Sequence, residues 1–234
     1  MKEKLILFII TFTLVLPSLF SCVDEQTRSL NNRTFSNTEE NSSNASTGLS
    51  YKTTKYDKTY NYDKLYSFYL KGNNKYIIFR TSQILRRSPS YFKAHFLKAL
   101  VLTRIGKIKE ANQSFMKASD ICKKRKRYSF SLIFSSLIGI NEAILGNTDY
   151  SIEKLNSLLK RRSINRYALS MACNAIGYSY YIKGMIKDAK RMFVKTVRMQ
   201  GGGYATTLGM AYLGIGKCYI LEHNYSAGEY NIAT

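Results

Sequence analysis

Two segments of the chain share one spacing of small, glycine and aromatic residues. The first reads AHFLKALVLTRIGKIKEANQSFMKASDI and the second reads NAIGYSYYIKGMIKDAKRMFVKTV. In each, a small residue is followed at offsets of 7, 12, 16 and 19 by a glycine, an alanine, a phenylalanine and another small residue. These residues are Ala99, Gly106, Ala111, Phe115 and Ala118, and then Gly177, Gly184, Ala189, Phe193 and Thr196. Agreement at five positions indicates a repeated structural unit.

Each unit is expected to be a pair of helices joined by a tight turn. Apolar residues at helical spacing give each helix one apolar stripe. The glycine suits the turn, and the small residues let the two helix backbones approach each other closely. One such hairpin cannot bury both of its faces, so neighbouring copies must stack. The chain has only 2 prolines in 234 residues, which also favours an all-α fold.

This pattern resembles the tetratricopeptide repeat (TPR) family. Its 34-residue motif has small residues at positions 8, 20 and 27, a glycine near 15, an aromatic residue at 24 and often a proline at 32. Gly72 and Pro89 fall at positions 15 and 32 of a first unit that starts at Lys58. Further units start at Phe92, Leu132, Ser170 and near Gly209. The resemblance implies a right-handed solenoid of about five helical hairpins within residues 51–234. The last three spacings exceed the motif, which indicates longer second helices or longer connectors.

Residues 1–22 have a charged start, the apolar run LILFIITFTLVL and then PSLFSC, the layout of a secretory signal. The run is shorter than the ~18 residues of a spanning helix and is broken by Pro17. The last four residues, LFSC, resemble the lipobox of bacterial lipoproteins in its relaxed, spirochaetal-type form, with Phe20 bulkier than the usual small residue. The resemblance implies a signal peptide over residues 1–21 and acyl chains such as palmitate on Cys22. Plain secretion and an uncleaved anchor are the alternatives.

The segment that follows is rich in Asn, Ser, Thr and Glu and has only scattered apolar residues. Such a composition cannot bury enough surface to offset the entropy of ordering the chain. Residues 22–50 are therefore interpreted as the lipidated cysteine and a flexible tether, which precede the helical domain of residues 51–234.

The TPR resemblance also implies a binding groove, because the inner face of such proteins is lined by fixed positions of the first helix of each unit. The residues at these positions that we select as groove residues are Tyr62, Tyr66, Tyr69, Lys93, Phe96, Arg104, Asn174, Tyr178, Tyr181 and Lys217. Amphipathic rings suit a groove that takes a helix or an extended segment of a protein partner. The alternative is that these tyrosines simply pack between neighbouring repeats.

A second candidate surface comes from runs of basic residues, in a chain whose formal net charge is +21. The runs lie at the ends of the second helices, which share one edge in a solenoid. This basic edge consists of Arg86, Arg87, Lys123, Lys124, Arg125, Lys126, Arg127, Lys160, Arg161 and Arg162. It would attract an anionic polymer or lipid. Two explanations that involve no binding partner stay open. Cations stabilise helix C-termini, and a biased genome raises the lysine content.

No catalytic set is visible in the sequence, and we expect neither enzymatic activity nor a cofactor. Cys122, Cys173 and Cys218 form no Cys-x-x-Cys pair and are interpreted as small buried hydrophobic residues. With only His95 and His223 available, a metal site is not expected.

The sequence therefore predicts a lipid-anchored adaptor or scaffold of the bacterial cell envelope, on the periplasmic face of a membrane. It would bind other envelope proteins through the groove or through an open, apolar C-terminal edge, although a short final helix could also close the domain. The alternative is a surface-exposed adhesin that binds polyanions through the basic edge. Nucleic acid is not an expected partner.

Overall fold

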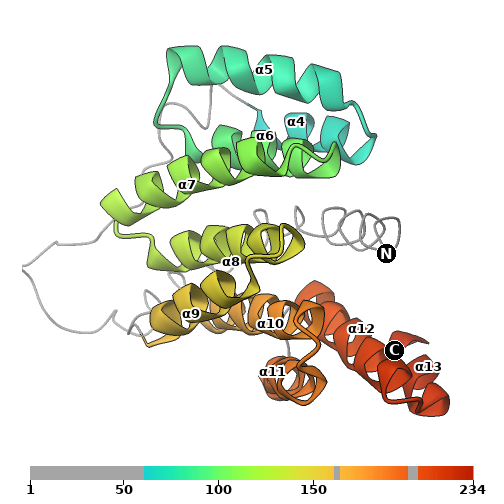
Figure 1. Cartoon of the computed structure of the whole chain (residues 1–234). Helices are drawn as coiled ribbons and strands as arrows, with labels where there is room; N and C mark the ends of the chain where they lie inside the picture. Colours follow the sequence, from blue (N-terminus) through green and yellow to red (C-terminus); the bar gives the residue numbers. More distant parts are fainter. Residues whose placement is uncertain (1–60, 161–163, 200–204, 234) are drawn as a thin grey trace, which may run out of the picture.

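The computed structural model describes residues 61–160, 164–199 and 205–233, and within these ranges the regular structure is entirely helical (Figure 1). Ten helices occur there: α4 (Tyr62–Leu70), α5 (Asn74–Arg87), α6 (Phe92–Arg104), α7 (Ile108–Lys124), α8 (Tyr128–Ile144), α9 (Thr148–Leu159), α10 (Arg166–Ile182), α11 (Ile186–Arg198), α12 (Ala205–Leu221) and α13 (Tyr225–Ala233). The prediction of an all-α fold is confirmed. The predicted signal peptide, Cys22, the tether, Arg161 and Arg162 lie outside the described residues.

Consecutive helices pack against each other in pairs, beginning with α4 and α5 and ending with α12 and α13. The pairs also contact their neighbours along the chain, since α6 packs on α5 and α7, and α8 packs on α7 and α10. Figure 1 shows the helices in chain order, with α4 and α5 at one end and α12 and α13 at the other. Each pair therefore buries surface that one hairpin alone would expose.

The turn inside each pair has the same geometry. Gly72, Gly106, Gly146 and Gly184 have positive φ angles of 76°, 80°, 93° and 81°. In each case the amide of the next residue donates to the carbonyl five residues before it, as the amide of Lys107 does to Leu102 at 2.8 Å. This bond satisfies a carbonyl that the end of the helix would leave unpaired. His223, with φ of 59°, takes the same place between α12 and α13. The prediction that glycines form the turns is confirmed for four pairs.

The first helices of the later pairs are longer than the sequence pattern indicates. Helices α8, α10 and α12 each have 17 residues, whereas α6 has 13. They begin at Tyr128, Arg166 and Ala205, one helical turn before the predicted unit starts. Part of the extra repeat length therefore lies in the first helix. The sequence pattern alone instead indicates a longer second helix or a longer connector. The added turn of α10 buries Tyr167 and Ala168, which explains why it forms.

Aromatic side chains join the first pairs through a continuous core. The Phe96 ring of α6 lies 6.1 Å from the Phe115 ring of α7 and 5.4 Å from the Phe134 ring of α8, measured between ring centroids. All three side chains are almost completely buried. The three cysteines Cys122, Cys173 and Cys218 are free and buried in the same core, which confirms their interpretation as small hydrophobic residues.

Candidate functional site

Four of the predicted groove residues form one stacked row at the N-terminal end of the described chain. Along α4, the Tyr62 and Tyr66 rings stack with centroids 6.3 Å apart, and the Tyr66 and Tyr69 rings stack at 5.9 Å. The guanidinium carbon of Arg104, from the end of α6, lies 3.7 Å from the centroid of the Tyr69 ring. Arg104 Nη1 also donates to the carbonyl oxygen of Tyr69 at 2.7 Å. We call Tyr62, Tyr66, Tyr69 and Arg104 the tyrosine ladder.

The ladder runs from buried to accessible side chains. Tyr69 is completely buried and Tyr62 nearly so, whereas Tyr66 and Arg104 keep part of their surface in solvent. Burial raises the pKa of the Tyr66 hydroxyl, so it stays protonated and can donate a hydrogen bond at neutral pH. Arg104 Nη2 is buried and has no hydrogen-bond partner among the described residues. The ladder thus offers an aromatic face beside one accessible donor side chain, Tyr66, whereas Arg104 Nη2 lies beneath the surface. Lys93, another predicted groove residue, lies 5.5 Å from the Tyr62 ring centroid.

The remaining groove residues lie elsewhere. On α10, the Tyr178 and Tyr181 rings stack with centroids 6.4 Å apart, and only Tyr181 is substantially accessible. Asn174 Nδ2 donates to the carbonyl of Thr207 at 2.9 Å, which ties α10 to α12. Lys217 is half-buried, and burial lowers the pKa of its ammonium group. Phe96 has no accessible surface and packs in the core.

The basic edge follows the loops between pairs. Arg125, after α7, donates from Nη2 to the carbonyl of Ser90 in the loop before α6, at 3.0 Å. The amide of Asn165, before α10, donates to Ser129 Oγ at 3.1 Å. The first bond joins the loop after α7 to the loop after α5, and the second joins the loop after α9 to the start of α8. Arg127 is partly buried, and the other described basic residues of the edge are exposed. The exposed residues are Arg86, Arg87, Lys123, Lys124, Arg125, Lys126 and Lys160.

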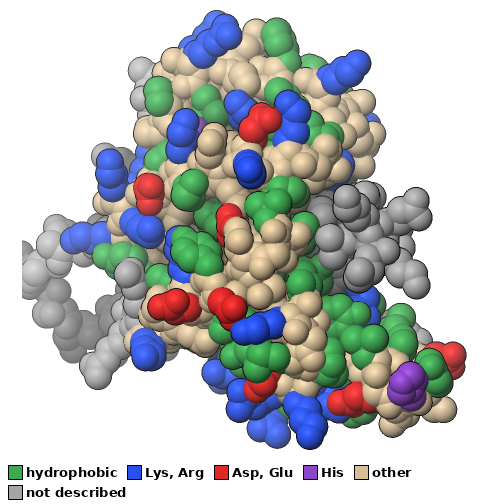
Figure 2. Space-filling model, in the orientation of Figure 1, with side chains coloured by type: hydrophobic (Ala, Val, Ile, Leu, Met, Phe, Trp, Pro, Cys, Tyr) green, Lys and Arg blue, Asp and Glu red, His purple; other side chains and the backbone are tan. Residues whose placement is uncertain are grey.

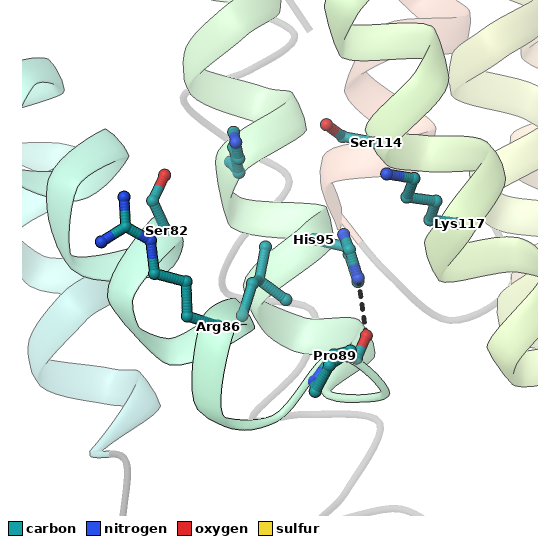
Figure 3. Close-up of a pocket in the computed structure, with 8 residues that line it drawn as sticks. Ser82, Arg86, Pro89, His95, Ser114 and Lys117 are labelled. Atoms are coloured by element: carbon teal, nitrogen blue, oxygen red, sulfur yellow. Dashed lines mark hydrogen bonds between the residues drawn. The ribbon is translucent and has the colours of Figure 1, made fainter.

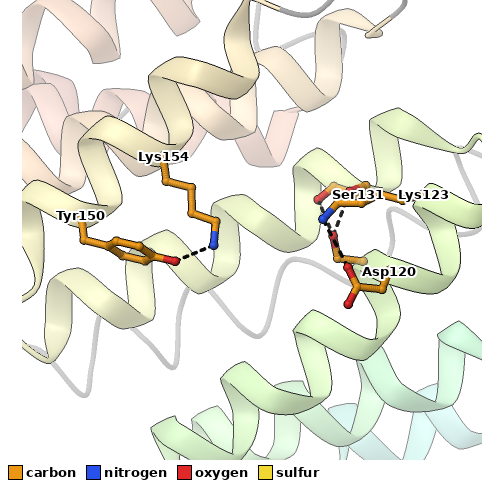
Figure 4. A network of polar contacts seen from close by, with 6 residues as sticks. Asp120, Lys123, Ser131, Tyr150 and Lys154 are labelled. Carbon is orange, nitrogen blue, oxygen red and sulfur yellow. Dashed lines mark hydrogen bonds and ion pairs between the residues drawn. The ribbon is translucent and has the colours of Figure 1, made fainter.

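Acidic side chains compensate little of this charge. Lys123 pairs with Asp120 at 3.2 Å, and in Figure 4 this pair lies beside Ser131 of the next helix. The Ser131 hydroxyl, in turn, is 2.8 Å from that of Ser119 and joins α7 to α8 inside the protein. Figure 2 shows Lys and Arg side chains spread over the visible face, where they outnumber the Asp and Glu side chains that lie among them. Among the exposed residues of the edge, Lys123 alone pairs with a carboxylate of a described residue, so the edge stays strongly positive.

A pocket of about 370 Å³ lies between α5, α6 and α7 and was not identified from the sequence (Figure 3). Each helix contributes a polar or basic pair at helical spacing. The pairs are Ser82 and Arg86, His95 and Lys98, and Ser114 and Lys117. Residues three or four apart share one helix face, so this spacing was the available signal. The sequence alone does not say that the three faces meet.

The described part of the chain contains neither a membrane-spanning helix nor a cluster of metal ligands. No helix in the described ranges is both long and apolar enough to cross a bilayer. In the same part of the chain, no three His, Cys, Asp or Glu side chains gather closely enough to hold a metal ion.

Burial raises the pKa of the Cys122 thiol to about 12 and that of Cys218 to about 11, so both are protonated and unreactive at neutral pH.

Comparisons with known proteins give no family for this chain. No protein-family model matches the sequence, and a search of the curated proteins finds no similar sequence.

Proposed function

We propose that this protein is a lipid-anchored adaptor of the bacterial cell envelope, without enzymatic activity, whose helical repeats resemble TPR units and bind another envelope protein. The tether of residues 22–50 would hold the repeat domain away from the membrane that carries the acylated Cys22. The adaptor function rests on the domain's accessible surfaces.

Contacts between equivalent positions support the repeat assignment. A Cβ atom on Gly139, at position 8 of its unit, would come within 2.7 Å of Leu155 Cδ1, at position 24. A Cβ on Gly216, at position 8 of the last unit, would come within 2.7 Å of Ile232 Cγ1, again at position 24. Small residues at position 8 therefore serve one purpose, which is to admit a large side chain of the second helix.

The tyrosine ladder is the observation that carries the binding function. Tyr66 and Arg104 are accessible, yet they are held in place by stacking on Tyr69, so little side-chain entropy is lost when a partner binds. Tyrosine and arginine, together with tryptophan, are enriched among energetically dominant interface residues. The protonated hydroxyl of the accessible Tyr66 favours a partner segment that presents a carbonyl or carboxylate oxygen beside an apolar or aromatic side chain.

Site-specific photo-crosslinking in cells tests this function with the full-length chain. A photo-reactive phenylalanine analogue replaces Tyr66 in one variant and Phe79 in the matched control. Phe79 lies on the neighbouring helix α5, outside the ladder, with 59% of its surface exposed. We expect one envelope protein to crosslink at Tyr66 and not at Phe79, and to be lost in an Arg104→Gln variant. Equal crosslinking at both positions would contradict a ladder-specific partner.

Lipid attachment has its own test. Cells that express the full-length chain are fed an alkyne-bearing palmitate analogue, and the purified protein is examined for label. We expect label on the natural chain and none on a Cys22→Ser variant, with Cys122→Ser as the control that keeps the label. Label that survives Cys22→Ser would overturn the anchor.

The basic edge supports a second candidate function, binding of a polyanion by a surface-exposed adhesin. Its side chains Lys124 and Lys126 are exposed and no acidic residue among the described ones pairs with them. Salt separates the two functions, because polyanion binding weakens steeply with ionic strength whereas the ladder's stacking contacts do not. Protease treatment of intact cells adds a second criterion, since an adaptor inside the envelope is protected and an adhesin is cleaved.

A further inference from the structure

The pocket between α5, α6 and α7 has the dimensions of a small-molecule site. Its volume of about 370 Å³ falls within the range of ligand pockets, roughly 300–1,000 Å³. Leu85 and Pro89 supply apolar surface, and the other lining residues are basic or hydroxylated, apart from His95. In Figure 3 the labelled side chains come from three separate helices and from the loop that carries Pro89.

The charge on this pocket has one sign. Arg86, Lys98 and Lys117 line it, and no carboxylate does. None of these three cations forms an ion pair with a described residue, although Lys107 and Lys123 on the same stretch of chain both pair with nearby carboxylates. Three like charges around one cavity repel each other, and a bound anion would relieve that repulsion.

The pocket also holds hydrogen-bond donors that are not in use. The hydroxyls of Ser82 and Ser114 form no hydrogen bond with a described residue, although Ser114 is buried. The carbonyl oxygen of Pro89 lies 2.8 Å from His95 Nε2 and can only accept, so Nε2 carries the proton. Burial lowers the pKa of the His95 imidazole, and the nearby charges of Lys117 and Lys98 lower it further. The ring is fixed and leaves Nδ1 to titrate.

We propose that this pocket binds the phosphate group of a small phosphorylated molecule through Arg86, Lys98 and Lys117, with Ser82 and Ser114 as hydroxyl donors. A phosphate monoester carries close to two negative charges and three strong acceptor oxygens at neutral pH, which suits three cations and two hydroxyls. The volume beyond one phosphate group leaves room for a further part of the ligand against Leu85 and Pro89. This site is separate from the tyrosine ladder and does not depend on the adaptor function.

Calorimetric titration of the full-length protein in phosphatidylcholine nanodiscs tests the site. The probes are inorganic phosphate, glucose 6-phosphate and uncharged glucose. Two variants remove the same charge from the same helix: Lys117→Gln inside the pocket and Lys109→Gln, at an exposed residue outside both the pocket and the basic edge. We expect phosphate and the phosphate ester to bind, glucose not to bind, and Lys117→Gln to weaken binding roughly tenfold. Lys109→Gln should change the dissociation constant by less than about twofold.

Chemical footprinting gives a second measurement that needs no variant. Lysine acetylation is followed by mass spectrometry with and without phosphate, and we expect protection of Lys98 and Lys117 but not of Lys109. Equal weakening by both variants, protection spread over all lysines, or absence of heat would overturn the proposal.

The same titration identifies the source of the phosphate group. It is repeated in nanodiscs that contain phosphatidic acid. If a lipid head group is the natural ligand, it occupies the pocket and weakens the binding of added phosphate. If a soluble phosphate ester is the ligand, binding is unchanged. Both results support the site and differ only in the molecule that fills it.

Discussion

The ring of Phe193 lies against the backbone of Gly177, so closely that a Cβ atom on Gly177 would come within 2.9 Å of ring atom Cε1. The same ring meets Gly214 of the next pair, where a Cβ would lie 2.6 Å from Cζ. One phenylalanine of α11 therefore fixes the approach of both α10 and α12. Two glycines are required because real Cβ atoms do not come this near to a ring.

Gly214→Ala should therefore destabilise the protein by ~1–3 kcal/mol, the usual cost of overpacking a core. Gly209→Ala is the matched control in the same helix, since nothing lies within 4 Å of its would-be Cβ. That control should be neutral or stabilising by up to ~1 kcal/mol, because alanine favours helix. Urea denaturation followed by circular dichroism measures both. Equal stability of the two variants would contradict the packing of Phe193.

The turns make a second pair of opposite predictions. Gly106, with φ of 80°, and His223, with φ of 59°, occupy equivalent turn positions. Gly106→Ala should cost ~1–2 kcal/mol, because a Cβ is strained in the left-handed region. His223→Gly should instead raise the melting temperature, since it removes the same strain from the last turn. Thermal unfolding of both variants checks the signs, and a shift in the same direction for both would refute the turn assignment.

A buried amide network predicts coupling between α7 and α8. Asn141 Nδ2 donates to Asn112 Oδ1 at 2.7 Å, and Asn112 Nδ2 donates to Glu142 Oε1 at 2.6 Å. Asn141→Ala leaves the Asn112 oxygen buried without its donor, which should cost ~1–3 kcal/mol. Asn112→Ala should cost less once Asn141 is already replaced. A double-mutant cycle in urea measures the difference, and strictly additive effects would argue against the network.

Local features of this fold could be read from the sequence, whereas the arrangement of its surfaces could not. The glycine before Lys107 predicted a turn because positive φ is a property of one residue and its neighbours. Helix start points were less certain, since the extra turn at Tyr167 forms through burial against other helices. Side-chain exposure depends still more on the packing of whole pairs.

The groove residues illustrate this limit. The sequence pattern predicts that Phe96 and Tyr66 both lie on the inner face, yet Phe96 is buried between two other phenylalanines and Tyr66 is partly accessible. Which of them a partner could reach depends on the rings of Phe115 and Phe134, both distant in the sequence. The basic pocket is the same case, because Lys98 and Lys117 meet only when α6 and α7 pack.

The last prediction concerns pH and His95. Burial lowers the pKa of its imidazole, the charges of Lys117 and Lys98 lower it further, and the hydrogen bond to the Pro89 carbonyl partly opposes them. Between this lowered value and the ordinary value of about 6.5, the unfolded chain binds a proton that the folded protein does not. The stability associated with His95 is therefore complete above about pH 6.5 and falls as the pH drops toward the folded pKa.

His95→Gln removes this titration while its amide can still donate to Pro89. From pH 7.5 to 5, the free energy of unfolding of the natural protein should fall more than that of His95→Gln, in buffers without phosphate. His223→Gln serves as the control, and curves for the natural protein and His95→Gln that stay parallel over this range would show that His95 is not held neutral by its surroundings.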